Sequence, residues 1–173
     1  MTLQRMDRAR FDEMYAIMED SFPTDEHRPR QAQQALFDDD RYAVYTLEKN
    51  GRILGFLAVW TLENWLFIEH FAVSSEARNR GLGGKMLQAL LASTDLRVCL
   101  EVELPESDIA RRRIGFYTRQ GLTFNDHPYV QPTMGEGQSP VPLRIMTSNG
   151  AIDRSEFRAL RTLLYRNVYR VEA

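Results

Sequence analysis

Hydrophobic positions in the first forty residues recur at helical intervals. Apolar residues three and four apart, from Phe11 to Met18, predict an amphipathic helix over residues 8–20. Residues 2–6 precede it as a short strand. Pro29 suits the first turn of a second helix, which we expect to continue to about residue 37. This end of the chain is therefore predicted as one strand followed by two helices.

The apolar spacing changes to two after residue 40, which is typical of strands. Residues 41–48 and 52–60 alternate on either side of Asn50-Gly51, a pair of residues that favours a tight hairpin turn. A third consecutive strand is expected over residues 65–73. The middle of the chain therefore predicts an antiparallel meander of three strands.

Helices and strands alternate in the remainder of the chain. A capping-box pattern from Asp153 to Glu156 opens the last predicted helix, and Gly121 suits the end of an earlier one. The expected elements are a helix over 82–93, a strand over 97–104, a helix over 106–120, a strand over 122–124, a turn-rich stretch over 125–140, a strand over 141–147 and a helix over 153–168.

This order of elements predicts a mixed α/β sheet in a single domain spanning residues 1–173, with a core over about 2–147. The helix over 153–168 is an addition to that core. Its apolar side chains at Phe157, Leu160 and Leu164 favour a brace packed on the domain. A contact in a homodimer is the alternative that the same pattern allows.

Composition excludes several classes of protein. The 173 residues carry 22 basic and 24 acidic side chains, and a net charge of −2 argues against general nucleic-acid binding. The single cysteine, Cys99, allows neither an internal disulfide nor a CxxC metal site, so we expect no metal. No apolar run is long enough to cross a membrane, and no leader pattern opens the chain. We therefore expect a cytoplasmic protein.

A glycine-rich turn between the strand over 65–73 and the helix over 82–93 is the strongest functional signal. It comprises Arg78, Asn79, Arg80, Gly81, Leu82, Gly83, Gly84 and Lys85. Uncovered N–H groups and the positive end of a helix favour a phosphate ligand here. Met86 stands where a Walker loop needs Ser or Thr, and where a dinucleotide fingerprint needs its last Gly. The turn therefore predicts a phosphate site of another kind.

The spacing Arg78-x-x-Gly81-x-Gly83 resembles the signature of the GNAT superfamily of N-acetyltransferases, (Gln or Arg)-x-x-Gly-x-(Gly or Ala). The predicted order of elements matches that fold over residues 2–147. The resemblance implies that the turn over 78–85 binds the pyrophosphate of acetyl-coenzyme A. It also implies that the backbone of Phe71, Ala72 and Val73 pairs with the pantetheine arm where two strands diverge.

Tyr117 is the candidate general acid. It precedes Gly121 as in the Tyr-x-x-x-Gly-Phe pattern of the family, where the tyrosine hydroxyl lies near the thioester sulfur and protonates the thiolate. Family members often carry Asn seven residues earlier, where this chain has Ala110. Some contacts to coenzyme A are therefore expected to differ.

The base that accepts the proton of the amine is predicted less specifically. Glu69 is the first candidate, because an acid that shares a strand face with Phe67, Phe71 and Val73 is expected to have a raised pKa. Glu101 on the next strand and a water relay are the alternatives. His70 is expected on the opposite face, against a helix.

Other polar features have plainer interpretations. Three successive arginines, Arg111-Arg112-Arg113, point in different directions on a helix and favour a solvated face. Cys99 is expected to be a small core residue. The loops over 21–30 and 125–140 are long enough to shape an acceptor pocket, in which Asp25 and Glu26 are candidates to bind a cationic amine.

The resemblance implies direct acetyl transfer from acetyl-coenzyme A to a primary amine of a small molecule or peptide. The sequence does not identify that amine, although residues 112–117 and 129–132 are similar to a bacterial subgroup of the family. A non-catalytic module that senses acyl-coenzyme A is the alternative. It would bind the same ligand without turnover.

Overall fold

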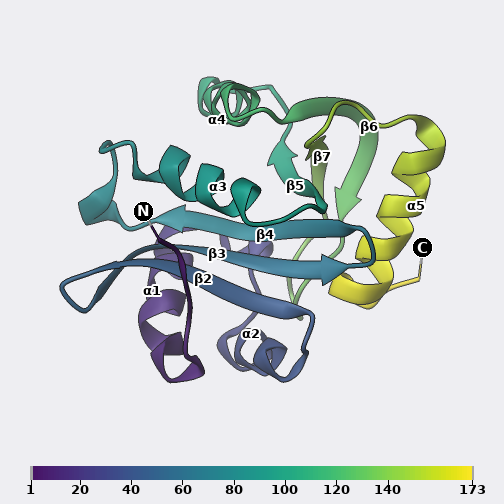
Figure 1. Cartoon of the computed structure of the whole chain (residues 1–173). Helices are drawn as coiled ribbons and strands as arrows, with labels where there is room; N and C mark the ends of the chain where they lie inside the picture. The colour runs from purple at the N-terminus through teal and green to yellow at the C-terminus, as the bar shows by residue number, and fades with distance from the viewer. Residues whose placement is uncertain (1, 173) are drawn as a thin grey trace.

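The computed structural model describes residues 2–172, which form one mixed sheet with helices on both faces (Figure 1). The strand order is β1-β2-β3-β4-β5-β7-β6. All neighbouring strands are antiparallel except β4 and β5, which run parallel. The strands are β1 (Gln4–Arg5), β2 (Tyr42–Lys49), β3 (Arg52–Leu62), β4 (Trp65–Val73), β5 (Arg97–Glu103), β6 (Thr123–Gln131) and β7 (Val141–Thr147).

The predicted meander is confirmed. Asn50 and Gly51 both have positive φ, as a two-residue hairpin turn requires, and they connect β2 to β3. The prediction of a strand over 65–73 matches β4. Local turn chemistry and alternation were therefore sufficient to place this half of the sheet.

The predicted helices are present with small changes at their ends. The expected helix over 8–20 starts as a 3-10 turn, Arg8–Arg10, and the capping box between Asp153 and Glu156 opens the last helix. A π-helical turn, Tyr165–Tyr169, continues that helix. The α-helices are α1 (Phe11–Ser21), α2 (Arg30–Ala35), α3 (Leu82–Ala92), α4 (Asp108–Arg119) and α5 (Arg154–Leu164).

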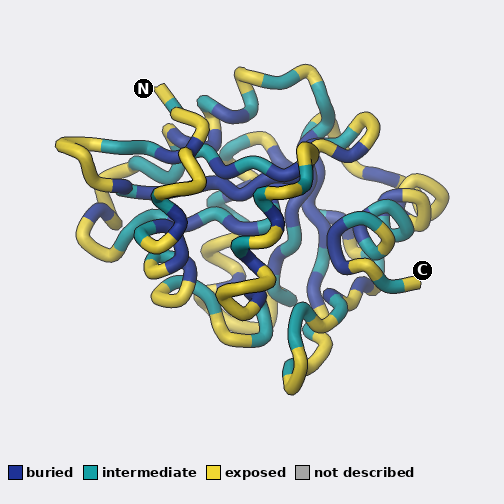
Figure 2. Tube along the Cα trace, turned by 90° about the horizontal axis from the view of Figure 1, so that it is seen from below, coloured by how far each residue is buried: buried dark blue, intermediate teal, exposed yellow. Residues whose placement is uncertain are grey.

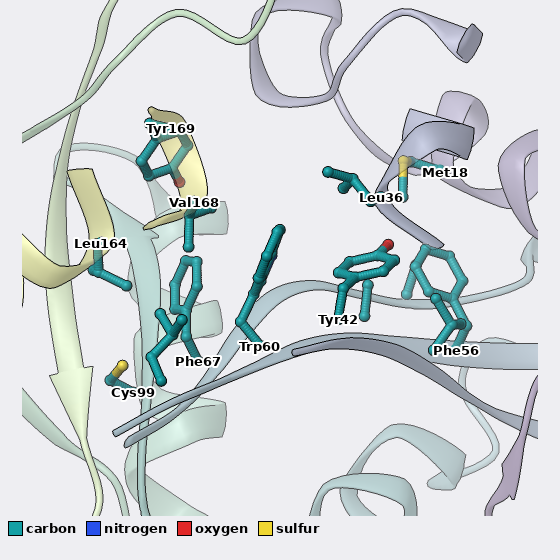
Figure 3. Packing of buried hydrophobic residues seen from close by; sticks show 14 of the residues in the cluster. Met18, Leu36, Tyr42, Phe56, Trp60, Phe67, Cys99, Leu164, Val168 and Tyr169 are labelled. Atoms are coloured by element: carbon teal, nitrogen blue, oxygen red, sulfur yellow. The ribbon is translucent and has the colours of Figure 1, made fainter. Parts of the chain in front are cut away.

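Two apolar clusters hold the layers together, one on each face of the sheet. Helices α1, α2 and α5 cover one face, where Trp60 lies between Tyr42 and Phe67 and Val168 packs above Phe67 (Figure 3). Helices α3 and α4 cover the other face through Met86, Leu87 and Tyr117. The strands are buried along most of their length, and exposed residues lie in the outer loops and on the outward faces of the helices (Figure 2).

The prediction of a turn-rich stretch over 125–140 is wrong for residues 125–131, which belong to β6. This strand lies at the edge of the sheet and pairs only with β7. Its pairing is interrupted between Asn125 and Tyr129, so Pro128 lies in a bulge where it has no ladder bond to donate. The polar residues and the proline of this segment are typical of loops, which is why the edge strand was not predicted.

Helix α5 is the brace that its apolar spacing predicts. Phe157, Leu160 and Leu164 are all buried against the first cluster. Because these three side chains already pack against residues of the same chain, the apolar face of α5 does not require a partner subunit to bury it. No helix in residues 2–172 has the length and hydropathy that a membrane crossing demands.

Candidate active site

The parallel pairing of β4 and β5 ends early. Four register pairs join the strands, from Trp65 opposite Arg97 to Ile68 opposite Leu100. Both strands continue beyond these pairs, β4 to Val73 and β5 to Glu103. Their facing backbone edges are therefore not joined over Glu69–Val73, which is the divergence that the sequence resemblance implied.

A bulge in β4 lies at the point of divergence. Ala58 of β3 pairs with His70, but the next residue, Val59, pairs with Ile68, so Glu69 is an extra residue. The extra residue reverses the alternation of side chains. The prediction that Glu69 shares a face with Phe71 and Val73 is therefore wrong.

Contacts define the two faces of β4 beyond the bulge. Phe71 and Val73 pack toward α3 and α4, whereas Glu69 contacts Trp60 on the opposite face. His70 packs against Phe22 on the same face as Glu69, so the prediction that it lies opposite Glu69 is also wrong. The bulge thus leaves both polar side chains on the face of α1 and α2.

The glycine-rich turn forms the N-terminus of α3. Gly81 caps the helix with φ of 70°, a conformation that a residue without Cβ adopts at no steric cost, and Asn79 also has positive φ. No side chain caps the first N–H groups of the helix. Arg78 donates from Nε to the carbonyl of Val73 at 3.1 Å, which ties the turn to the end of β4. The geometry suits an anion.

One cavity, of about 470 Å3, runs between this turn and α4. We call it the donor cavity. Eight of the eleven residues predicted to bind the cofactor line it, and Arg80, Gly84 and Lys85 do not. The eight are Phe71, Ala72, Val73, Arg78, Asn79, Gly81, Leu82 and Gly83.

A second cavity, of about 430 Å3, lies on the other side of the divergence. We call it the acceptor cavity. Phe22 and Glu26 from the loop after α1 line it, together with Gln131 of β6. The wall is stiffened where the loops meet, because the Gln138 amide donates to the carbonyls of Thr24 and His27, each at 2.8 Å. The loop after α1 and strand β6 thus line this cavity, and Gln138 of the second loop holds the first loop in place.

The two cavities meet at shared residues. Both are lined by Phe71, Ala72, Val73, Arg78, Arg113 and Tyr117. A ligand in the donor cavity and a ligand in the acceptor cavity would therefore come together beside the end of β4 and the Tyr117 ring.

Tyr117 is nearly buried at this junction, with 9% of its surface exposed. Burial raises the pKa of its phenol to about 12, against a smaller opposing effect of Arg113, so the hydroxyl stays protonated at neutral pH. Within residues 2–172 the hydroxyl has no hydrogen-bond partner. The group is therefore free to donate a proton to a ligand.

Glu69 is held by two donors at the edge of the acceptor cavity. Arg28 donates to Oε2 and the Trp60 indole donates to Oε1, each at 2.8 Å. The side chains of Glu69 and Arg28 are 0% and 7% exposed, so this is a buried ion pair. Arg28 also donates to the carbonyl of Val168. Through these two contacts Arg28 connects the loop after α1 to the bulge and to the C-terminal segment.

Glu101 of β5 also lines the acceptor cavity. It accepts hydrogen bonds from the hydroxyls of Tyr129 and Tyr169, at 2.5 and 2.6 Å, and from the Gln131 amide at 3.1 Å. Burial is the main cause that raises the pKa of Glu101 to about 7. The three hydrogen bonds lower it, and the charge of Glu69 raises it further.

Some residues around the cavities were missed from the sequence. The three arginines of the run are all exposed, as the prediction of a solvated helix face requires. The sequence did not show that Arg112 lines the donor cavity and that Arg113 lines both cavities. The signal that could have indicated this is the place of Arg112 and Arg113 in the helix that ends at Tyr117, the predicted general acid. Tyr169 lies 68 residues from Glu101, and no local pattern connects them.

Two further predictions concern metals and Cys99. Cys99 is fully buried in the first cluster, and burial raises the pKa of its thiol well above the usual value, as suits a core residue. Among residues 2–172 no three His, Cys, Asp or Glu side chains gather as a metal site would require.

Stability should depend on pH through Glu101. The folded chain keeps this proton to about pH 7, whereas the unfolded chain loses it near the ordinary value of 4.5. The native state binds more protons between these values, so the free energy of unfolding falls as pH rises, on the order of 3 kcal/mol over the window. Urea unfolding of wild type and Glu101→Gln at pH 4.5 and 8 measures the difference.

Glu101→Gln lacks the titrating group. The free energy of unfolding of wild type, relative to that of Glu101→Gln, should therefore fall as pH rises toward 8. Glu103→Gln, on the same strand with an exposed side chain, is the matched control and should not change the pH dependence. Parallel curves for wild type and Glu101→Gln would contradict the assignment.

Comparisons with known proteins agree with this architecture. Among solved structures, a protein described as "Putative acetyltransferase from GNAT family" from Bacteroides thetaiotaomicron is 27% identical, with a TM-score of 0.92 over 99% of this chain and all of that one. A variant of spermidine N-acetyltransferase SpeG from Vibrio cholerae has a TM-score of 0.65 at 12% identity, covering 86% of this chain and 94% of that one. The latter likeness shows the fold alone.

Sequence comparisons lead to the same family. The Bacillus subtilis (strain 168) protein named "Putative acetyltransferase YjbC" is 29% identical over 108 residues, which are 61% of this chain and 54% of that protein. The alignment thus spans about half the length of this relative. The profile of the acetyltransferase (GNAT) family matches residues 11–122, which is more than half of the chain. The chain is therefore a member of the acetyltransferase (GNAT) family.

Proposed function

We propose that this protein transfers the acetyl group of acetyl-coenzyme A to a primary amine while both substrates are bound. The observation that carries the proposal is the meeting of two cavities where β4 and β5 separate. Acetyl-coenzyme A is the acetyl donor in this family. The amine of a small molecule or peptide would reach the thioester from the acceptor cavity, so the chemistry is mainly a matter of positioning.

The donor side is assigned to backbone groups and one helix end. The free N–H groups at the start of α3 would bind the pyrophosphate, with Arg78, Arg80 and Lys85 supplying positive charge around it. The open edge at Phe71–Val73 would pair with the pantetheine arm as an added strand. Pairing of this kind would present the thioester to Tyr117 at the junction.

The reaction itself forms one bond and breaks another. The amine nitrogen forms a C–N bond with the thioester carbonyl carbon, and the C–S bond then breaks, with its electron pair leaving on sulfur. Tyr117 gives its proton to that sulfur. Glu69 accepts the proton of the amine through water, since its two oxygens already accept one hydrogen bond each and retain further lone pairs.

Binding of acetyl-coenzyme A should depend on Gly83. A Cβ at this position would meet Phe71, Val73 and Phe116 at ordinary contact distances of 3.6–3.8 Å. Gly83→Ala is therefore expected to fold and bind, whereas Gly83→Glu places a longer, negative side chain in the donor cavity. Calorimetric titration should show micromolar binding by wild type and Gly83→Ala and none by Gly83→Glu. A well-folded wild type that does not bind would refute the proposed function.

Tyr117→Phe should lower kcat at least tenfold and change the affinity for acetyl-coenzyme A by less than threefold, because it removes only the proton donor. Tyr165→Phe is a matched control, since Tyr165 lines neither cavity. Steady-state release of coenzyme A measures both variants. An unchanged kcat in Tyr117→Phe would favour the alternative of a non-catalytic sensor, or another acid.

The role of Glu69 is tested by a pH profile. Without a base the rate depends on amine that has already lost its proton, so kcat/KM of Glu69→Gln should rise about tenfold per pH unit up to the pKa of the amine. Wild type should reach a plateau at lower pH. Glu63→Gln, in the exposed turn between β3 and β4, leaves Glu69 and its donors intact and should keep the wild-type profile. Identical profiles for wild type and Glu69→Gln would exclude Glu69 as the base.

A further inference from the structure

Two carboxylates in the acceptor cavity have no cationic partner. Five acids line the cavity, and three of them are in ion pairs: Asp20 with Arg78, Glu69 with Arg28, and Glu103 with Arg113. Within residues 2–172 no ion pair includes Glu26 or Glu101. The arginines that line the cavity, Arg78 and Arg113, are each engaged, so a carboxyl group without a cationic partner remains at each of these two positions.

Both unpaired acids are partly buried. Glu101 lies on β5, and its donors within residues 2–172 are all neutral, namely two tyrosine hydroxyls and the Gln131 amide. Glu26 is partly exposed in the loop after α1, and burial followed by the charge of Glu103 raises the pKa of its carboxyl. A buried charge without a counterion is costly, so both positions favour a cation supplied by a ligand.

Unpartnered hydrogen-bond acceptors in the same cavity independently indicate a ligand that carries donors. Gln131 is 4% exposed, and its Oε1 has no hydrogen-bond partner within residues 2–172. His70 is 2% exposed, and its Nε2 lies 2.6 Å from the carbonyl of Glu26, which can only accept, so Nε2 bears the proton. Its Nδ1 is then an acceptor, and it too lacks a partner. Buried orphan groups of this kind are rare in proteins.

The remaining walls are apolar. Ile68, Val102 and Leu143 line the cavity between the acidic positions. Carboxylates and orphan acceptors separated by such walls match a ligand with N–H donors joined by methylene groups. An anion would be repelled by these carboxylates. A monoamine would leave them without a cation once its only nitrogen loses its proton to react.

We propose that the acceptor is an aliphatic diamine or polyamine, whose reacting amino group lies at the junction while a second, protonated amino group binds in the field of Glu101, Glu26 and the acceptors of Gln131 and His70. This assignment rests on the proposed acetyl transfer and names its substrate class. Glu101 acts here in recognition, and Glu69 remains the proposed base.

The test compares three amines with the same four-carbon chain. Butylamine has one charge, 1,4-diaminobutane has two, and 4-aminobutanoate replaces the second amine with a carboxylate. With acetyl-coenzyme A as donor, kcat/KM for the diamine should exceed that for butylamine at least thirtyfold, well beyond the factor of two from its second reactive group. The value for 4-aminobutanoate should lie below that for butylamine.

Glu101→Gln and Glu26→Gln should each reduce the preference for the diamine at least tenfold, mainly through KM, and both should still bind acetyl-coenzyme A. The Glu26 variant changes a loop residue and keeps the test valid if Glu101→Gln does not fold. Glu63→Gln, in the exposed turn between β3 and β4, is the matched control and should behave as wild type.

Calorimetry with 1,4-diaminobutane and butylamine in the absence of coenzyme A provides a readout that does not require turnover. Binding of the diamine alone, lost in the Gln variants, supports the proposal. Equal kcat/KM for diamine and butylamine, or a preference that survives both substitutions, overturns it. Failure of acetyl transfer itself would be seen separately, as no release of coenzyme A by the folded wild type with any of the three amines, while calorimetry still reports whether the diamine binds.

Discussion

A single extra residue in β4 is the constraint on which the site depends. The bulge at Glu69 lies directly after the last pair between β4 and β5, and it reverses which side chains face which layer. Phe71 and Val73 can therefore pack toward α3 and α4 while Glu69 and His70 face α1 and α2. The same short segment borders the donor cavity and the acceptor cavity, because the bulge separates the apolar residues from the polar ones.

Buried polar contacts hold that segment to parts of the chain that are distant in sequence. Arg28 joins the loop after α1 to Glu69 and to the carbonyl of Val168, and Tyr169 reaches Glu101. A buried ion pair is not a strong source of stability, because desolvation opposes the attraction, but breaking one partner leaves an unpaired charge. These contacts therefore specify geometry more than they add stability. The C-terminal segment, which lies outside the family match, therefore supports the acceptor cavity from behind, through Tyr169 on Glu101 and Val168 on Arg28.

The division into two cavities separates two kinds of recognition. The donor cavity lies beside the N-terminus of α3 and the end of β4, where backbone groups are open to a ligand. The acceptor cavity is lined by side chains from the loop after α1 and from β4, β5 and β6. Apart from the residues that line both cavities, the two are bounded by different elements, so the lining of one can change while that of the other is kept.

Much of the architecture follows from the sequence by itself, because local spacing and turn chemistry determine it. The Asn50-Gly51 hairpin, the capping box at Asp153 and the glycine turn at Gly81 each depend on neighbours a few residues away. The donor cavity, too, is built largely from one local segment: eight of the eleven residues predicted to bind the cofactor line it, and all eight lie between Phe71 and Gly83.

The arrangement of side chains in the acceptor cavity could be seen only in the tertiary structure. A bulge shifts the alternation by one residue without a sequence signal, so the face of Glu69 was predicted incorrectly. Glu101 is surrounded by Tyr129, Gln131 and Tyr169, which are 28 to 68 residues away. Its burial and pKa come from those long-range contacts, and only the folded chain brings them together.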